Sequence, residues 1–167
     1  MNNFMQRAIE IAQKSGADVP VGTLIIKNDE IISFAYNEKE KNNDPTAHAE
    51  ILAIKQAALL IGNWRLEDCE LYVTLEPCPM CAWAILQSRI KTVYFGSYDS
   101  QYGAFGSVLD LRQQTNSRLK VYGGILEKEC DNVIREFWKG KRQAVGCGFI
   151  RTDNKSKGSP SKGRCEG

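Results

Sequence analysis

The most constraining feature of this sequence is a lone histidine that is followed closely by a glutamate and, further along, by a Cys-x-x-Cys pair. His48 is the only histidine among 167 residues, and Glu50 lies two positions after it. Cys78 and Cys81 form the cysteine pair. One imidazole nitrogen and two thiolates would supply three protein ligands to a zinc ion and leave the fourth tetrahedral position to water, which is the arrangement of a catalytic zinc site.

The spacing of the two cysteines predicts that they converge at the start of a helix. Residues at i and i+3 share one face of a helix, so Cys78 and Cys81 would point the same way from a first turn. Pro79 suits that turn, because its missing N–H is one of the donors that a helix start leaves unpaired. Thiolates at this position also gain from the positive end of the helix dipole.

The histidine and the glutamate are predicted to meet at the N-terminal end of a second helix. His48 and Glu50 stand at i and i+2, a spacing that separates side chains in the middle of a helix, but every Cβ leans toward the N-terminal end. The segment Asp44-Pro45-Thr46 indicates a turn and a helix start, with Thr46 as the expected N-cap. Glu50 would then lie beside the metal and carry protons.

Each motif taken alone has other interpretations. A Cys-x-x-Cys pair also occurs in structural zinc sites and in redox pairs, and a histidine near a helix start commonly serves as a capping or packing residue. A structural zinc would need a fourth Cys or His ligand, whereas a redox pair would need neither His48 nor Glu50. The combination of His-x-Glu with Pro-Cys-x-x-Cys favours a catalytic zinc.

Hydrophobic periodicity predicts a chain that mixes strands and helices. We expect helices over residues 2–15, 46–61, 80–87 and 127–142, and strands over residues 21–27, 31–36, 70–75, 91–95 and 118–122. The helix over 46–61 is apolar nearly all round and is therefore expected to be buried. Two strand-to-helix units that each place ligands at a helix start predict an α/β fold, with helices on both faces of a sheet and the site at one sheet edge. Residues 97–107 are expected to form a loop near that site.

Composition indicates one catalytic domain followed by a basic tail. Hydrophobic residues make up 43% of the chain, which is enough for a core. Residues 1–134 carry 13 Lys/Arg and 17 Asp/Glu, whereas residues 135–167 carry 9 and 3, so any phosphate contacts would draw on the C-terminal end. A solvated tail is the alternative. We expect the domain to span residues 1–143 and the Gly/Ser/Lys-rich tail over 144–167 to be disordered.

The six cysteines do not require a disulfide framework in a chain of this length and apolar content. Two are assigned to metal, and Cys69 and Cys130 are expected to be buried small hydrophobes. No apolar run approaches the roughly 18 residues of a membrane span, and the N-terminus lacks the apolar stretch of a secretory signal. The sequence therefore predicts a protein of a reducing compartment, the cytoplasm.

Further blocks accompany the two motifs in one order: Val19-Pro20-Val21-Gly22, Asn37, Asp44-Pro45-Thr46-Ala47-His48-Ala49-Glu50-Ile51, Leu71-Tyr72-Val73-Thr74-Leu75-Glu76-Pro77-Cys78, Ser88-Arg89-Ile90, Phe95-Gly96, Gly106-Ser107, Gly124-Ile125-Leu126 and Glu129-Cys130. Together they resemble the zinc-dependent nucleobase deaminase family. Within that family, the resemblance is to the bacterial tRNA-specific adenosine deaminases, which convert the wobble adenosine of a tRNA anticodon to inosine.

The resemblance implies a three-layer α/β/α cytidine-deaminase-like fold with a central mixed sheet of about five strands. It implies one Zn²⁺ per subunit and a homodimer that binds a tRNA anticodon stem-loop. It also implies that Asn37 and the backbone near Ala49 contact the target nucleotide, and that Asp99 and the loop after it shape the pocket. From the residues alone, Asn37 is equally explained as a turn residue at a strand end.

The last predicted helix carries the candidate RNA contacts. Phe137 or Trp138 would stack on a splayed anticodon base, as single-stranded RNA loops require, and the basic residues Lys139, Lys141 and Arg142 follow them. Aromatic residues at helical spacing are also commonly core residues.

Two other functions fit the same motifs. The segment Glu76-Pro77-Cys78-Pro79-Met80-Cys81 also resembles guanine deaminases, so a free-base or nucleoside deaminase of the guanine or cytosine type is one alternative. A catalytically silent, zinc-containing RNA-binding subunit is the other. Glu76 is a competing carboxylate to which we assign a structural role. Tyr102 and Phe105 are bulky where the family generally has small residues, so the resemblance does not define the substrate contacts of this loop.

Overall fold

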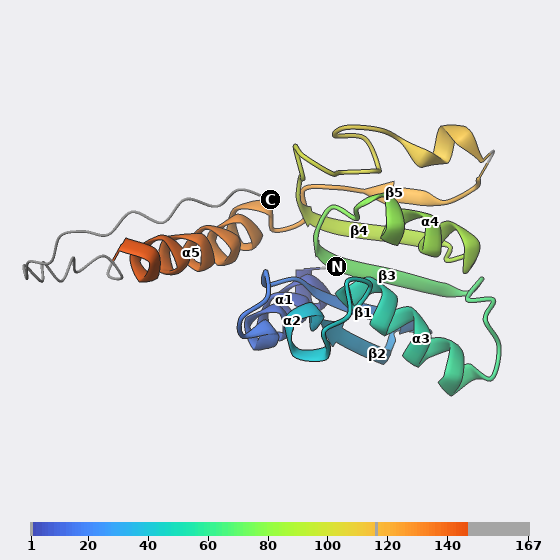
Figure 1. Cartoon of the computed structure of the whole chain (residues 1–167). Helices are drawn as coiled ribbons and strands as arrows, with labels where there is room; N and C mark the ends of the chain where they lie inside the picture. The colour runs from blue at the N-terminus through green and yellow to red at the C-terminus, as the bar shows by residue number, and fades with distance from the viewer. Residues whose placement is uncertain (1, 116, 147–167) are drawn as a thin grey trace, which may run out of the picture.

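The computed structural model describes residues 2–115 and 117–146. Its strands are β1 (Gly22–Lys27), β2 (Glu30–Tyr36), β3 (Cys69–Leu75), β4 (Thr92–Ser97) and β5 (Lys120–Tyr122). They form one five-stranded sheet in the order β2-β1-β3-β4-β5 (Figure 1). β1 is antiparallel to both of its neighbours, whereas β3, β4 and β5 run parallel. The predicted mixed sheet of about five strands is confirmed.

Helices cover both faces of this sheet. They are α1 (Asn2–Ala12), α2 (Lys39–Asn42), α3 (Ala49–Ile61), α4 (Pro79–Gln87) and α5 (Glu127–Gly146), with 3-10 turns η1 (Gln13–Ser15) and η2 (Leu111–Gln114). α3 and α4 pack together on one face, and α1 packs against β1 and β3 from the other face, where α5 contacts β4 (Figure 1). The three-layer α/β/α fold expected from the sequence is confirmed.

The core lies on both sides of the sheet, because successive side chains of a strand point to opposite faces. Ile25, Leu71 and Val73 belong to the cluster that α3 and α4 cover. Leu24, Ile26 and Tyr72 belong to the cluster that α1 and Cys130 of α5 complete. Each such buried aliphatic side chain contributes about 1.5–3 kcal/mol relative to an exposed one. Cys69 and Cys130 are buried free thiols, as expected.

The first strand approaches the first helix very closely at Gly22. A Cβ at this position would overlap the carbonyl oxygen of Ala8 and would lie 2.7 Å from the backbone nitrogen of Ala12. Only the absence of a side chain at Gly22 therefore lets α1 lie directly on β1. At the other end of β1, Asn28 and Asp29 have φ values of 52° and 63°, as a two-residue hairpin turn with right-handed strand twist requires.

The predicted start of the second helix at Thr46 is wrong. α3 begins at Ala49, and the residue before it, His48, has extended backbone angles. Thr46 instead donates both its N–H and its hydroxyl to Asp44 Oδ1, each at 2.7 Å. The Asp-Pro-Thr segment therefore forms its own turn upstream of the helix. Because the Thr46 hydroxyl donates to the Asp44 side chain, Thr46 does not cap the helix.

The expectation that helix α3 is buried all round is also wrong. Its small residues Ala49, Ala53 and Ala57 are buried against the sheet, whereas Leu59 and Leu60 are 83% and 67% exposed. The described residues therefore leave part of an apolar helix uncovered.

The remaining elements agree with the expected ones within a few residues at each end, and α2 and η2 were not predicted. α5 runs to Gly146 and thus past the expected domain end at residue 143. The rest of the predicted tail, residues 147–167, lies outside the described residues. None of the described helices is both long enough and apolar enough to cross a membrane.

Candidate active site

His48 is placed at the entrance of α3 by a residue from another element. Its backbone is extended, with φ −74° and ψ 148°, and its side chain caps nothing. The helix start is instead held by Asn37 from the end of β2, whose Oδ1 accepts a hydrogen bond from Ala49 N at 2.9 Å. Asn37 Nδ2 donates to Val19 O, also at 2.9 Å. The His48 imidazole is therefore free to point away from the helix.

Cys78 and Cys81 occupy the N-cap position and the first turn of α4, as their spacing predicted. Cys78 has extended backbone angles, Pro79 is the first helical residue, and Ala82 N donates to Cys78 O at 2.8 Å. Strand β3 delivers the chain to this point through Pro77. Cys81 is buried, whereas Cys78 is partly exposed.

The three side chains converge in the way a zinc ion requires. His48 Nδ1 lies 3.5 Å from Cys81 Sγ and 3.8 Å from Cys78 Sγ, and all three atoms lie within 4.8 Å of one another. Two ligands at ordinary Zn–N and Zn–S distances in a tetrahedron are about 3.6 Å apart. The residues present therefore fit zinc. Within the described part of the chain, only these three side chains gather in this way, so one tetrahedral position is left for a non-protein ligand.

The three groups also shift one another's pKa values, and only Cys78 is shifted toward the deprotonated form that binds a metal. Interaction with Cys81, followed by that with His48, lowers the pKa of Cys78 to about 4. Interaction with Cys78 raises the pKa of His48, and the same thiolate together with burial raises the pKa of Cys81. Because metal ligands must be deprotonated, a cation that binds here releases protons from Cys81 and His48.

Glu50 lies in the first turn of α3, beside these ligands. Its side chain is only 4% exposed, and burial raises the pKa of the Glu50 carboxyl to about 7. A carboxyl group whose pKa lies near the working pH is suited to both taking and giving a proton. The position and environment of Glu50 therefore agree with the predicted proton carrier.

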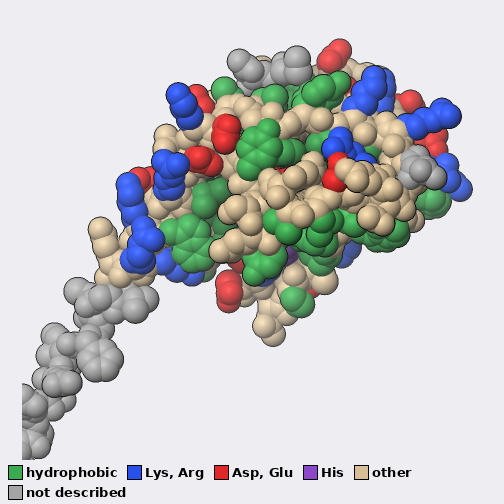
Figure 2. Space-filling model, turned by 90° about the horizontal axis from the view of Figure 1, so that it is seen from above, with side chains coloured by type: hydrophobic (Ala, Val, Ile, Leu, Met, Phe, Trp, Pro, Cys, Tyr) green, Lys and Arg blue, Asp and Glu red, His purple; other side chains and the backbone are tan. Residues whose placement is uncertain are grey.

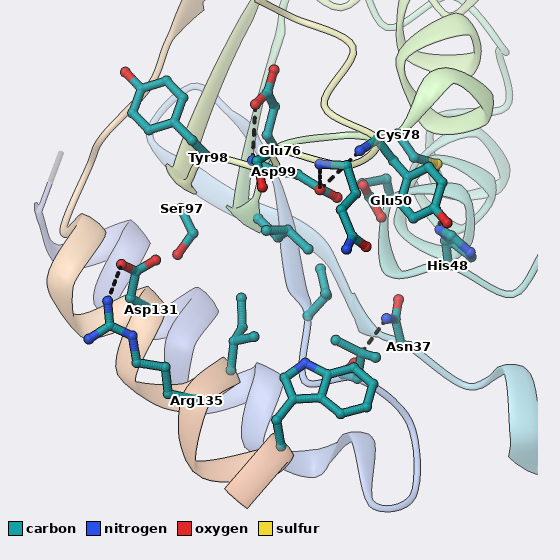
Figure 3. A pocket seen from close by; sticks show the side chains of 18 of the residues that line it. Asn37, His48, Glu50, Glu76, Cys78, Ser97, Tyr98, Asp99, Asp131 and Arg135 are labelled. Atoms are coloured by element: carbon teal, nitrogen blue, oxygen red, sulfur yellow. Dashed lines mark hydrogen bonds and ion pairs between the residues drawn. The ribbon is translucent and has the colours of Figure 1, made fainter. Parts of the chain in front are cut away.

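A cavity of about 790 Å³ opens onto this group. Figure 3 shows His48, Glu50 and Cys78 at one end of the cavity, and Ser97, Asp131 and Arg135 at the other. The walls come from the residues just before β1 and just after β2, the end of β3, the segment 97–102, and one face of α5. A volume of this size holds more than a single nucleobase and falls in the range of ordinary ligand sites.

The structure brings some of the predicted contact residues to the cavity and leaves others away from it. Asn37, Asp99 and Trp138 line the cavity. Ala49 does not, and its N–H is donated to Asn37. Phe137 lies instead in a separate hollow between α1 and α5. Lys139, Lys141 and Arg142 are exposed further along α5.

Of the α5 wall of the cavity, sequence reasoning identified only Trp138. Asp131, Ile134 and Arg135 line it together with Trp138, and Asp131 and Arg135 form an ion pair at 3.4 Å. The i, i+3, i+4, i+7 spacing of these residues places them on one face of a helix, and this periodicity was the available signal. Ser97 and Tyr98 also line the cavity, and no motif marks them.

Tyr102 and Phe105, the two bulky residues of the glycine-rich loop, have different roles. Tyr102 lines the cavity and is largely exposed. Phe105 is buried in the core cluster that α3 and α4 cover. Only Tyr102 can therefore alter substrate contact directly.

A sequence profile of the cytidine and deoxycytidylate deaminase zinc-binding region matches residues 1–97. The chain belongs to this family of zinc-dependent deaminases. The tRNA-specific adenosine deaminase of Bacillus subtilis (strain 168) is 41% identical over 144 residues, which are 84% of this chain and 89% of that protein. The family resemblance seen in the sequence is thus confirmed, and with it a zinc cofactor and a hydrolytic deaminase class.

Two solved structures extend the comparison. One, from biochemical and structural studies of A-to-I editing by tRNA:A34 deaminases at the wobble position of transfer RNA, has a TM-score of 0.77 and 36% identity over 80% of this chain and 99% of the other. The guanine deaminase of Bacillus subtilis has a TM-score of 0.56 and 32% identity over 64% of this chain and 80% of the other. This chain is thus similar to both kinds of deaminase, with the higher structural score for the tRNA:A34 enzymes.

Proposed function

We propose that this protein is a tRNA-specific adenosine deaminase that converts the wobble adenosine of a tRNA anticodon to inosine. The observation that carries the proposal is the His48, Cys78 and Cys81 cluster beside a buried glutamate in a relative of such enzymes. The reaction replaces the C6 amino group of adenine by a water-derived oxygen and releases ammonia.

His48, Cys78 and Cys81 would hold the zinc ion. A zinc ion held there would supply a Lewis acid that lowers the pKa of a water molecule toward neutrality. Glu50 would take a proton from the attacking water, deliver a proton to the purine ring, and later protonate the departing amine. Burial suits Glu50 to this sequence, because a pKa of about 7 leaves both of its protonation states accessible near neutrality.

The cavity residues would orient the nucleotide. Asn37 uses its Oδ1 for Ala49 N and one Nδ2 hydrogen for Val19 O, so a second Nδ2 hydrogen is left to donate to the substrate. Ala49 is itself fully buried and its N–H is engaged, so contact with the base near this residue would come from its neighbours His48 and Glu50, which line the cavity. Asp99 lines the cavity from the opposite wall.

The α5 helix would contact the rest of the anticodon loop. Trp138 lines the cavity and offers a stacking surface for a splayed base. Figure 2 shows Lys and Arg side chains along the arm that α5 forms, and Arg135, Lys139, Lys141 and Arg142 are exposed there. These charges would pair with RNA phosphates. Phe137 remains a candidate only for contacts outside the cavity.

We also propose a homodimer of the catalytic domain. Leu59, Leu60, Trp64 and Trp83 expose apolar surface on the side of the sheet covered by α3 and α4, and such surface commonly marks a protein contact. The domain would extend from the N-terminus through α5. A cytoplasmic location fits this function, and the four described cysteines are free thiols.

The decisive experiment offers two substrates to the full-length protein with zinc. An anticodon stem-loop with adenosine at the wobble position should release ammonia and show inosine at that position on sequencing, whereas free guanine should release none. Ammonia from guanine without inosine would establish the guanine deaminase alternative, which the solved guanine deaminase structure favours. No reaction with either, despite bound zinc, would favour the silent RNA-binding subunit.

A further inference from the structure

Glu76 lies where β3 leaves the sheet, just before the first cysteine ligand, and the proposed reaction does not use it. Its side chain is 2% exposed, and it borders the cavity. All of its partners come from the segment 99–107, which crosses the cavity wall from β4. Oε1 accepts from Phe105 N at 3.0 Å and from Ser107 N at 3.1 Å. Oε2 accepts from Asp99 N at 3.2 Å and from the Ser107 hydroxyl.

These four donors saturate the carboxylate. An ionised carboxylate offers about four lone-pair sites, and each oxygen of Glu76 already accepts two hydrogen bonds. No ion pair to Glu76 occurs within the described part of the chain. The buried charge is therefore balanced by the loop N–H groups and one hydroxyl, and hydrogen bonds to an ionised acceptor are about twice as strong as neutral ones.

The loop held in this way carries cavity residues on its other side. Asp99 Oδ1 accepts from Gln101 N at 2.9 Å and from Tyr102 N at 3.0 Å, and Asp99 and Tyr102 both line the cavity. Figure 3 shows Glu76 and Asp99 side by side at the cavity, joined by a hydrogen bond. Hydrogen bonds made by the backbone N–H and by the carboxylate of Asp99 thus hold this residue in place.

Gly103 shows how tightly the loop closes around Glu76. A Cβ at this position would overlap the Glu76 carboxylate and would lie 2.5 Å from the carbonyl oxygen of Asp99. The loop therefore has no room for a side chain between its two ends. Its conformation depends on the carboxylate inside it.

We propose that Glu76 is a positioning residue for deamination, which fixes the 99–107 loop so that Asp99 and Tyr102 meet the substrate in one arrangement. It acts through Asp99 and takes no part in the chemical step, because all four of its acceptor positions are occupied by the loop. The identity of the substrate rests on the proposed function, whereas the anchoring of the loop does not.

The test is a double-mutant cycle between Glu76→Gln and Asp99→Ala in the full-length protein. The glutamine NH₂ group cannot accept hydrogen bonds, so two of the four donors lose their acceptor. We expect Glu76→Gln to lower kcat/KM for the stem-loop at least about ten-fold, as misplacement of a substrate contact does, with zinc content unchanged. When Asp99 is already replaced by alanine, Glu76→Gln should lower kcat/KM less than about two-fold, because the effects of residues that act together are not additive. Wild-type kcat/KM in Glu76→Gln, or equal losses in both backgrounds, would overturn the proposal.

Hydrogen exchange separates this proposal from the proposed function. The amides of Asp99, Phe105 and Ser107 should exchange at least about ten-fold faster in Glu76→Gln, while the Ala49 amide stays unchanged. Glu30→Gln, the same change at an exposed side chain, is the matched control and should alter none of them. If the wild-type protein forms no inosine, the proposed function fails, and the exchange rates still decide the role of Glu76.

A second variant covers the case in which Glu76→Gln does not fold. Ser107→Ala removes one donor to Oε2 and leaves the three amides in place. It should lower kcat/KM about three-fold and speed exchange of the Asp99 amide, which shares that oxygen, by a similar factor. Unchanged kinetics and exchange in this variant would contradict the anchoring role.

Discussion

Glu50 and Glu76 are both buried and both border the cavity, but their hydrogen bonds differ. Four donors surround Glu76, whereas burial is the main influence on Glu50 and raises its pKa to about 7. Such contrasting surroundings commonly separate a structural carboxylate from one that moves protons. At the scale of single residues, these surroundings support Glu50 rather than Glu76 as the proton carrier of the proposed reaction.

Replacing Glu50 by glutamine should abolish deamination and spare the metal. The amide keeps the size of the side chain and cannot take a proton, so we expect kcat to fall by about 10²–10⁴-fold. Ammonia release and metal analysis together measure the effect. His48→Ala is the contrasting variant, since it should lose zinc as well as activity. Substantial turnover by Glu50→Gln with a full zinc content would exclude Glu50 from this role.

The zinc ligands and Glu50 could be predicted from the sequence, because each motif is short and its spacing determines which side chains share a helix turn. The residues Asp131 and Arg135 of α5 could not be assigned to the cavity in the same way. They reach it only after α5 has docked beside β4, and periodicity along a helix does not say which element its face will meet. The three amides around Glu76 are backbone groups, and no residue type marks them.

At the scale of elements, both metal helices begin immediately after a residue in extended conformation. The turn signals around Thr46 predicted a start three residues too early, because a side-chain turn at Asp44 takes the donors of Thr46. Asn37 accepts a hydrogen bond from the Ala49 N–H and so fixes the start of α3 at Ala49. His48 therefore stays outside the helix, where it can face a metal. Local propensity carries no information about a cap supplied from another strand.

The contact between α1 and β1 gives a direct test of element packing. Gly22→Ala places a methyl group against the Ala8 carbonyl and the Ala12 backbone, and we expect a loss of about 1–3 kcal/mol or more in the free energy of unfolding. Urea denaturation followed by circular dichroism measures it. Gly140→Ala is the matched control: it lies on exposed α5 with no atom within 4 Å of the added methyl group. It should stabilise that helix by about 0.5–1 kcal/mol, and equal effects at both sites would refute this account.

At the scale of the whole molecule, periodicity predicted the layers but not the strand order. The pairing of β1 with β3 joins residues such as Thr23 and Val73, which are far apart in the chain, and no local signal specifies it. The apolar residues found nearly all round α3 likewise predicted that this helix is buried within a single chain. A second copy that covers Leu59 and Leu60 explains both the sequence pattern and the exposure.

The proposed dimer predicts a change of mass in solution. Replacing Leu59 and Leu60 together by lysine should convert the protein to a monomer, because burying two unpaired charges in an interface is strongly unfavourable. Light scattering coupled to size-exclusion chromatography measures the mass. Tyr122→Lys is the control, since Tyr122 is another exposed apolar side chain but lies on β5, and the mass of this variant should match the wild type. A wild-type protein that stays monomeric at all concentrations would contradict the dimer.

The pairing of β1 with β3 also governs when the protein can acquire its metal. His48 follows the β1–β2 hairpin, and both cysteines follow β3, so the donor set is divided between an early and a late part of the polypeptide. Until these two parts dock, the chain offers a metal only the two cysteine thiols together. These thiols can then be oxidised or can bind the wrong metal ion. Loading of the correct metal is therefore coupled to the docking of these two parts, and metal uptake reports that step.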